Sequence, residues 1–311
     1  MSHTKKVYDA LPDHQGDVHL GAGGASLGSS IVNLSAAVLG AGMLGLPYGF
    51  AEAGWATSFL LLGGSTLTSG FTMHLLSIVS REVAPEGDAT FFKLAATVGD
   101  WGTAFVEWTV ICNVFGLATS YLVVFGSTMP FVVGSRPNSG ILTSTHLWVT
   151  IGLVCVAPMA FASTLDALRF TSAGGMACVA YVVGLVSFYW FFDPDALCDD
   201  DEPHCGGNEI EFVADVSLLN MLSVVTFSFT AHVQALTVAN EVQEYTQAKM
   251  DTVIFGGIFL CLIVYGVVGF GGYWGFGSDI AGNLLISYPT HSVVVTAARV
   301  SMSFLVAISY P

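Results

Sequence analysis

The sequence predicts an all-α membrane protein whose helices cross the bilayer several times. Hydrophobic residues make up 53% of the 311 residues and charged residues only 10%, against about 25% charged residues in ordinary soluble domains. The apolar runs are long and continuous rather than alternating with a period of two residues, which favours helices over a transmembrane β-barrel. A nucleic-acid partner would need clustered Lys and Arg, and the chain has 8 of these residues against 23 acidic ones. The expected surroundings are therefore a lipid bilayer.

Apolar stretches long enough to be spans recur along the whole chain. About 20 helical residues cross the hydrocarbon core of a bilayer. Eight stretches qualify, at about 27–50, 56–79, 102–133, 145–163, 168–192, 217–240, 252–276 and 292–311. Residues 1–25 are polar and lack the apolar run and cleavage site of a signal peptide, so a disordered tail is expected there.

The basic residues predict the orientation of these spans. Cytoplasmic loops carry an excess of Lys and Arg. Only Arg136 falls in an outside loop if the N-terminus is cytoplasmic, and Arg299 lies within the last span. The other six cations then lie inside: Lys5, Lys6, Arg81, Lys93, Arg169 and Lys249. The bias predicts a cytoplasmic N-terminus.

The loop at 193–216 is then an outside loop, and it is strongly acidic. It contains Cys198 and Cys205, in a compartment where disulfides persist. A disulfide between these two cysteines is the favoured interpretation. The alternative is a metal site that includes His204, although the three residues lack a recognised ligand spacing, and no metal is expected.

The first span contains helix-breaking residues where its middle should lie. Gly40, Gly42, Gly45 and Pro47 all fall within it, and Gly and Pro weaken a helical ladder. A break near Gly40–Gly42 would start a half-helix at about Met43, with Pro47 in its first turn. The free N–H groups of such a half-helix would bind a carboxylate. The alternative is that these glycines serve close helix packing.

The sixth span shows a second, weaker interruption. Thr230, His232 and Gln234 lie in an otherwise apolar helix, and polar groups at membrane depth face a cavity or another helix. The alternative is a His satisfied by a neighbouring helix. Transporters built from two inverted five-helix repeats break the first helix of each repeat and bind substrate between the breaks. That scheme makes 26–192 a first repeat and 217–311 part of a second.

At these residues the chain resembles the amino acid/auxin permease family, which includes sodium-coupled neutral amino acid transporters and fungal vacuolar amino acid permeases. The segment NLSAAVLGAGMLGLPYGFAEAGW (33–55) looks like the first-helix signature of that family. FSFTAHVQALTVANEV (227–242) is similar to its sixth helix, and Arg299 followed by an apolar run to Pro311 looks like the start of its eighth helix. The resemblance implies a LeuT-type inverted-repeat fold, usually with eleven spans, and transport of amino acids rather than an enzymatic activity.

The resemblance also implies a binding site. The backbone at Gly40, Ala41, Gly42, Met43 and Leu44 would hold the substrate carboxylate. The segment Phe229–His232, including Thr230, would face the amino group or the side chain of the substrate. Few charged residues lie at this depth, so neutral amino acids are favoured.

The coupling ion is left open between H⁺ and Na⁺, and no other cofactor is expected. Asn33 and Ser309 match positions that bear on ion coupling in sodium-coupled relatives, but a second family Asn is replaced by Ala36. His232 and His74 are the candidates for proton coupling within spans, because His titrates near physiological pH.

The organisation that follows is a tail at 1–25 and a transporter domain at 26–311 with about eight of eleven spans, so we expect a C-terminally incomplete chain. The alternative is a short form that assembles with a partner, although protein partners stay unknown. The expected function is secondary active transport, as in a symporter, at a plasma membrane or a vacuolar or lysosomal membrane. The alternatives are a sensor that binds an amino acid without net transport and a non-functional fragment.

Overall fold

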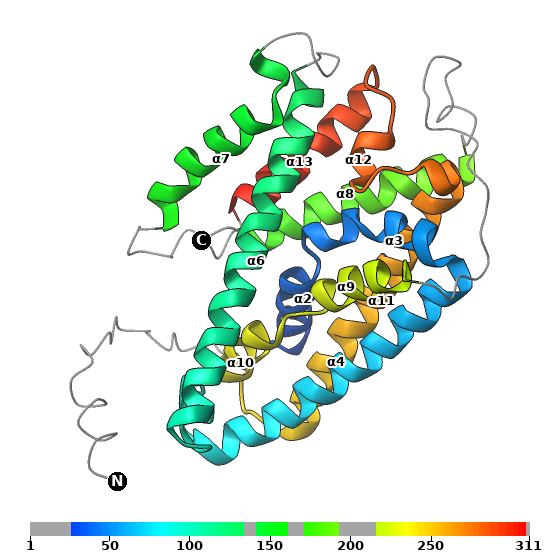
Figure 1. Ribbon diagram of the computed structural model, residues 1–311. Helices are drawn as coiled ribbons and strands as arrows, with labels where there is room; N and C mark the ends of the chain where they lie inside the picture. The colour runs from blue at the N-terminus through cyan, green and yellow to red at the C-terminus, as the bar shows by residue number, and fades with distance from the viewer. Residues whose placement is uncertain (1–25, 134–140, 161–170, 193–215, 309–311) are drawn as a thin grey trace.

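A computed structural model describes residues 26–133, 141–160, 171–192 and 216–308, and these residues form helices and no strand. The all-helical class predicted from the sequence is therefore confirmed. In chain order the elements are α2 (Leu27–Val38), the 3₁₀ helix η1 (Ala41–Leu44), α3 (Leu46–Ala53), α4 (Trp55–Val83), α5 (Phe91–Ala96), α6 (Asp100–Val132), η2 (Ile141–Thr143), α7 (Thr145–Ala160), α8 (Thr171–Phe192), α9 (Leu218–Ser228), α10 (His232–Glu241), α11 (Gln247–Phe276), η5 (Gly277–Asp279), α12 (Leu284–Ser287) and α13 (Val293–Ile308) (Figure 1).

Several of these helices have the length and composition of membrane spans. Within the described residues, 5 helical stretches are long and apolar enough to cross a membrane: Trp55–Val83, Asp100–Val132, Gly174–Phe192, Leu218–Glu241 and Gln247–Asp279. Shorter apolar helices cover Leu27–Val38, Thr145–Ala157 and Val293–Ala307. The number of spans and the inverted repeat stay predictions.

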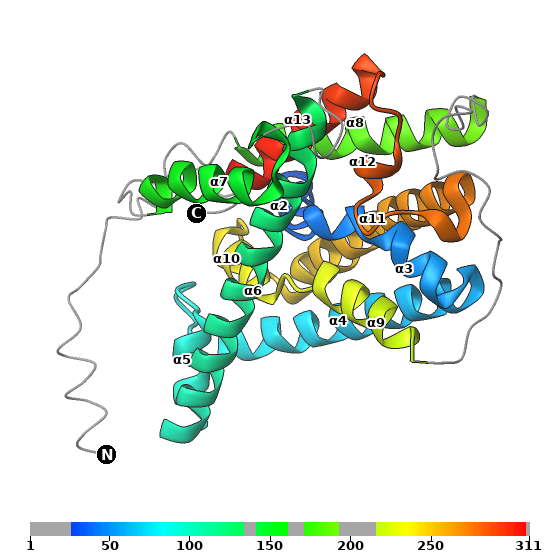
Figure 2. The same ribbon diagram turned by 45° about the horizontal axis from the view of Figure 1, so that its top comes forward.

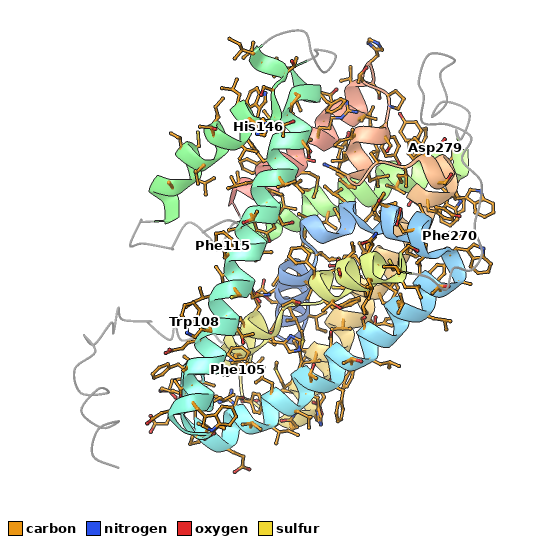
Figure 3. The ribbon with its side chains drawn as sticks, in the orientation of Figure 1. Phe105, Trp108, Phe115, His146, Phe270 and Asp279 are labelled. Atoms are coloured by element: carbon orange, nitrogen blue, oxygen red, sulfur yellow. The ribbon has the colours of Figure 1, made fainter. Side chains whose placement is uncertain are left out.

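The outer face of α6 supports the membrane class. Phe105, Trp108 and Phe115 are 67%, 68% and 74% exposed, and Figure 3 shows them along this one helix. A contiguous exposed apolar face is rare on a soluble monomer. Contact with lipid explains this face, because apolar side chains that would be unfavourable in water are favourable against the hydrocarbon of a bilayer.

Helix α11 lies at the centre of the packing. It packs against α2, α3, α4 and α8, while α13 packs on α6 and α8, and α7 covers the outside of α6 (Figure 2). The largest buried side chains around α11 include Phe50, Phe229, Tyr265 and Tyr273. Helices α2 and α3, on either side of the helix-breaking residues of the first apolar stretch, therefore both rest on one long continuous helix.

Local sequence signals explain where the helices begin and end. The hydroxyl groups of Ser26 and Thr246 accept from the backbone N–H three residues on, which caps α2 and α11. Gly54 and Gly277 have φ values of 79° and 62°, which favour glycine, and they end α3 and α11.

A buried cation holds the segment between α11 and α13. The side chain of Arg299, on α13, is fully buried. Its Nε donates to the carbonyl of Leu285 at 3.0 Å and its Nη2 to the carbonyl of Tyr288 at 2.7 Å. These carbonyls lie in and just after α12, where a helix C-terminus attracts positive charge. Arg299 thus fixes α12 on α13.

Candidate functional site

The first apolar helix is broken where its glycines lie. Helix α2 ends at Val38, and Gly40 is extended with φ −111° and ψ −155°. A single 3₁₀ turn, Ala41–Leu44, separates it from α3, which carries Pro47 in its first turn. The regular helix resumes at Leu46 rather than at the predicted Met43, because the glycine-rich residues form the tighter 3₁₀ turn first.

The second break lies between α9 and α10. Helix α9 ends at Ser228 and α10 begins at His232, so Phe229–Ala231 are outside both helices. The hydroxyl groups of Ser228 and Thr230 donate to the carbonyls four residues earlier, at 2.8 and 2.7 Å. Hydroxyl bonds of this kind compete with the backbone ladder and bend helices.

The two breaks touch each other at Gly42. A Cβ atom on Gly42 would lie 2.5 Å from the Ser228 Oγ and 3.3 Å from the Ser228 Cα. A real Cβ does not approach other heavy atoms this closely, so the Ser228 hydroxyl would have to turn away and the Ser228 backbone to shift by a few tenths of an ångström. Glycine at this position therefore permits the contact between the breaks.

A cavity of about 180 Å³ opens beside this contact. The first break, the second break and α6 all contribute to its wall. Its polar lining includes the side chains of Tyr121, Thr230 and Gln234, and the described residues that line it include no charged side chain. The full lining is Ala36, Ala37, Val38, Leu39, Gly40, Ala41, Gly42, Leu117, Tyr121, Phe227, Ser228, Thr230 and Gln234.

The structure brings some of the predicted site residues to the cavity and leaves others in the core. Gly40, Ala41, Gly42 and Thr230 line the cavity. The side chains that are buried in the surrounding core instead are those of Met43, Leu44 and Phe229.

His232 faces a different helix. Its Nε2 lies 2.8 Å from the Thr72 Oγ1 on α4, and it is not among the lining residues. This is the arrangement in which a neighbouring helix satisfies the imidazole. Asn33 is half-buried on α2, outside the lining. The predicted roles of Ser309 and of the Cys198–Cys205 pair fall outside the described residues.

Tyr265 is a residue of this region that the sequence did not indicate. Its fully buried hydroxyl on α11 lies 2.6 Å from the carbonyl oxygen of Val38 and 2.9 Å from that of Ser228. Its ring also contacts Phe229 edge-on, with the centroids 5.2 Å apart. A single side chain thus binds the last residue of both α2 and α9. The sequence did not indicate Tyr121 either. A single Tyr in an apolar helix matches no motif, and this holds for both residues.

Comparison of the sequence with known proteins places the chain in a family. The profile described as "Transmembrane amino acid transporter protein" matches residues 23–311. The chain is 30% identical over 308 residues to "Vacuolar amino acid transporter 5" of Schizosaccharomyces pombe, covering 98% of this chain and 70% of that protein. It is 26% identical to "Vacuolar amino acid transporter 7" of Saccharomyces cerevisiae, covering 91% and 56% respectively.

A more distant relative is "Sodium-coupled neutral amino acid symporter 2" of Danio rerio, at 23% identity over 93% of this chain and 62% of that protein. These relatives are transporters and not enzymes. The extent of the profile match settles the family. The chain belongs to the transmembrane amino acid transporter family, and it is a membrane protein.

Proposed function

We propose that this protein moves amino acids across a membrane by secondary active transport with alternating access, and that the substrate binds in the cavity between the two breaks. The observation that carries the proposal is that one cavity is lined by residues of both interrupted helices, Val38–Gly42 from the first and Phe227, Ser228 and Thr230 from the second. Paired breaks leave backbone N–H and C=O groups free to bind a substrate inside the membrane, where the lipid offers no hydrogen-bonding groups of its own.

The size and lining of the cavity support a small neutral substrate. An engineered protein cavity of about 150 Å³ holds benzene, which has as many non-hydrogen atoms as alanine. The cavity here measures about 180 Å³, and no charged side chain is among its described lining residues. A charged substrate side chain would be left without a partner there, at a high desolvation cost.

The first break is the proposed site for the substrate carboxylate. The first N–H groups of a helix have no acceptor within it, and Ala41 and Gly42 occupy these positions in η1 while lining the cavity. Thr230 of the second break and Gln234 of α10 also line the cavity, and their side-chain oxygen atoms can accept hydrogen bonds from the substrate ammonium group.

The wider setting follows the same proposal. Residues 26–192 form one inverted repeat and 217–311 part of the second, and the coupling ion is H⁺ or Na⁺. Names of two relatives favour a vacuolar membrane. The cations Arg81, Lys93 and Lys249 lie near the end of α4, in α5 and at the start of α11, which supports a cytoplasmic position for this end and for the N-terminus.

Substitution of a single glycine tests the site. In Gly42→Ala the new methyl group meets Ser228 at 2.5 Å, whereas a Cβ on Gly63 of α4 meets nothing within 4 Å. Both changes replace glycine by alanine in an apolar segment. We expect Gly42→Ala to abolish uptake of radiolabelled neutral amino acids into proteoliposomes while Gly63→Ala retains it.

One control and two refuting outcomes make the result decisive. Size-exclusion profiles of both variants in detergent should match that of the wild type, so that loss of uptake is not loss of folding. Normal uptake by Gly42→Ala would refute the assignment of the site. Saturable binding of the amino acid by the wild type without flux in either direction would refute transport and indicate a sensor.

A further inference from the structure

A polar cluster joins α4 to α11 away from the cavity. The His74 Nδ1 lies 2.6 Å from the Asp251 Oδ1, and the two side chains are 29% and 30% exposed. The helices α4 and α11 pack along each other in both views (Figures 1 and 2). An imidazole and a carboxylate therefore meet between two helices that are long and apolar enough to cross a membrane.

Neutral groups fix the position of the carboxylate. The Gln247 Nε2 donates to the same Asp251 Oδ1 at 2.8 Å and also reaches the Ser77 Oγ at 2.8 Å. The Tyr245 hydroxyl in turn donates to the Gln247 Oε1 at 2.9 Å. These bonds orient Asp251 toward His74 without neutralising its charge.

The neighbouring ionisable groups have other contacts. The Arg81 guanidinium lies 3.8 Å from the centroid of the Tyr245 ring and donates to the Ala239 carbonyl, and Lys249 pairs with Glu244 at 3.5 Å. Helices α2, α8 and α9 carry no charged side chain among their described residues. Of the remaining ionisable groups nearby, Glu82 and Glu241 are exposed. His232 contacts α4, and Glu52 accepts a hydrogen bond from α9.

This leaves one site in the cluster where a proton can add. The short Nδ1–Oδ1 contact contains one hydrogen atom, which the neutral imidazole donates to the carboxylate. Among the described residues, the Nε2 of His74 has no protein partner. A proton that binds there converts the imidazole to imidazolium and takes the net charge of the pair from −1 to zero. The adjacent carboxylate stabilises the imidazolium by a charge-assisted hydrogen bond.

The pair also lies on the helices that hold the breaks. Two residues before His74, Thr72 contacts His232 at the start of α10. Fourteen residues after Asp251, Tyr265 of α11 bonds the ends of α2 and α9. A change in the contact between α4 and α11 therefore acts on elements that bear directly on the cavity.

We propose that the His74–Asp251 pair is the proton-binding site of this protein and that a proton bound at the Nε2 of His74 moves with the substrate. The inference rests on the proposed transport function. One basis is the geometry of the pair. Another is that, within the described residues, no Lys or Arg forms an ion pair with Asp251. The third is the capacity of histidine to change charge near neutral pH.

The test separates proton movement from substrate movement. Proteoliposomes containing a pH-sensitive dye receive a mixture of radiolabelled neutral amino acids, and proton influx and counterflow exchange are measured for the wild type, H74Q and D251N. The control is H146Q, because His146 is exposed and lies at the start of α7, at the top of Figure 3. Gln at position 74 keeps hydrogen-bonding capacity and cannot carry the proton.

We expect the wild type and H146Q to show substrate-driven proton influx, and H74Q and D251N to lose it while retaining counterflow exchange. If H74Q also fails in exchange, D251N decides, because it keeps the imidazole and removes only the stabilising charge. Undiminished proton influx in H74Q or D251N, or sodium-driven uptake without proton movement in the wild type, would overturn the inference and leave the transport proposal standing. A wild type without counterflow would overturn the transport proposal itself.

Discussion

The hydroxyl group of Tyr265 offers the sharpest test of how the two breaks are held. Tyr265→Phe removes one oxygen atom and leaves the ring in place against Phe229. The oxygen lies between the carbonyl of Val38 at 2.6 Å and that of Ser228 at 2.9 Å. Both carbonyls belong to residues that line the cavity. Its removal should therefore loosen the wall of the proposed substrate site without opening a large void.

The size of the effect follows from the number of bonds lost. One hydroxyl group carries one hydrogen atom, so it makes one full hydrogen bond at a time. The Val38 carbonyl also accepts from the Gly40 N–H at 2.9 Å, so the change falls mainly on the Ser228 carbonyl. Leaving a buried acceptor without its donor costs about 1–3 kcal/mol. If about 1–2 kcal/mol of this appears in substrate binding, KM rises roughly 5–30-fold.

The assay is the concentration dependence of amino acid uptake in proteoliposomes. A matched control is Tyr181→Phe, because the Tyr181 hydroxyl also donates to a backbone carbonyl, that of Val294 at 2.9 Å, but outside the cavity. We expect KM to rise in Tyr265→Phe and to stay at the wild-type value in Tyr181→Phe. Equal KM values in both variants would refute the reasoning, as would a fall in both uptake and expression that left KM unchanged.

Two further predictions concern the ends of the bundle. Arg299→Lys cannot reproduce both bonds of the buried guanidinium to the α12 carbonyls, so the Tm in detergent should fall by the equivalent of about 1.5–3 kcal/mol for one charge-assisted bond; an unchanged Tm would contradict this. The hydrogen bond from Lys93 lowers the pKa of Asp88 in the loop before α5, so the contact is complete at neutral pH and is lost as the pH falls through that lowered pKa. Hydrogen exchange of α5 should therefore accelerate at acid pH in the wild type and already at neutral pH in Asp88→Asn; equal rates in the two proteins at neutral pH would contradict this.

The first break was readable from the sequence because glycine and proline act through the backbone. Gly40, Gly42 and Pro47 weaken a helical ladder, so their positions indicated an interruption, with close helix packing as the alternative, and the structure shows the interruption between Val38 and Leu46. The start of the second half-helix was placed three residues too early. Whether a turn closes as α or 3₁₀ depends on its tertiary contacts, here the approach of Gly42 to Ser228.

The second break and its neighbours show where sequence reasoning stops. No Gly or Pro lies between Ser228 and His232, and the interruption depends on hydroxyl groups and on a tyrosine from α11 that bonds the freed carbonyl. Tyr265 is 37 residues away from Ser228 along the chain, and no local sequence pattern predicts this contact.

The same limit applies to the polar residues of the spans. The sequence predicted that His232 would face either a cavity or a neighbouring helix, and helical spacing could not decide between them. In the folded chain Thr230 lines the cavity and His232, two residues later, contacts Thr72. Thr230 lies outside both helices and His232 is the first residue of α10, so one break can present a wall of the cavity and also a link to α4. The polar residues of the sixth span thus divide between the lining of the cavity and a contact with α4, and only the position of α4 decides which residue does which.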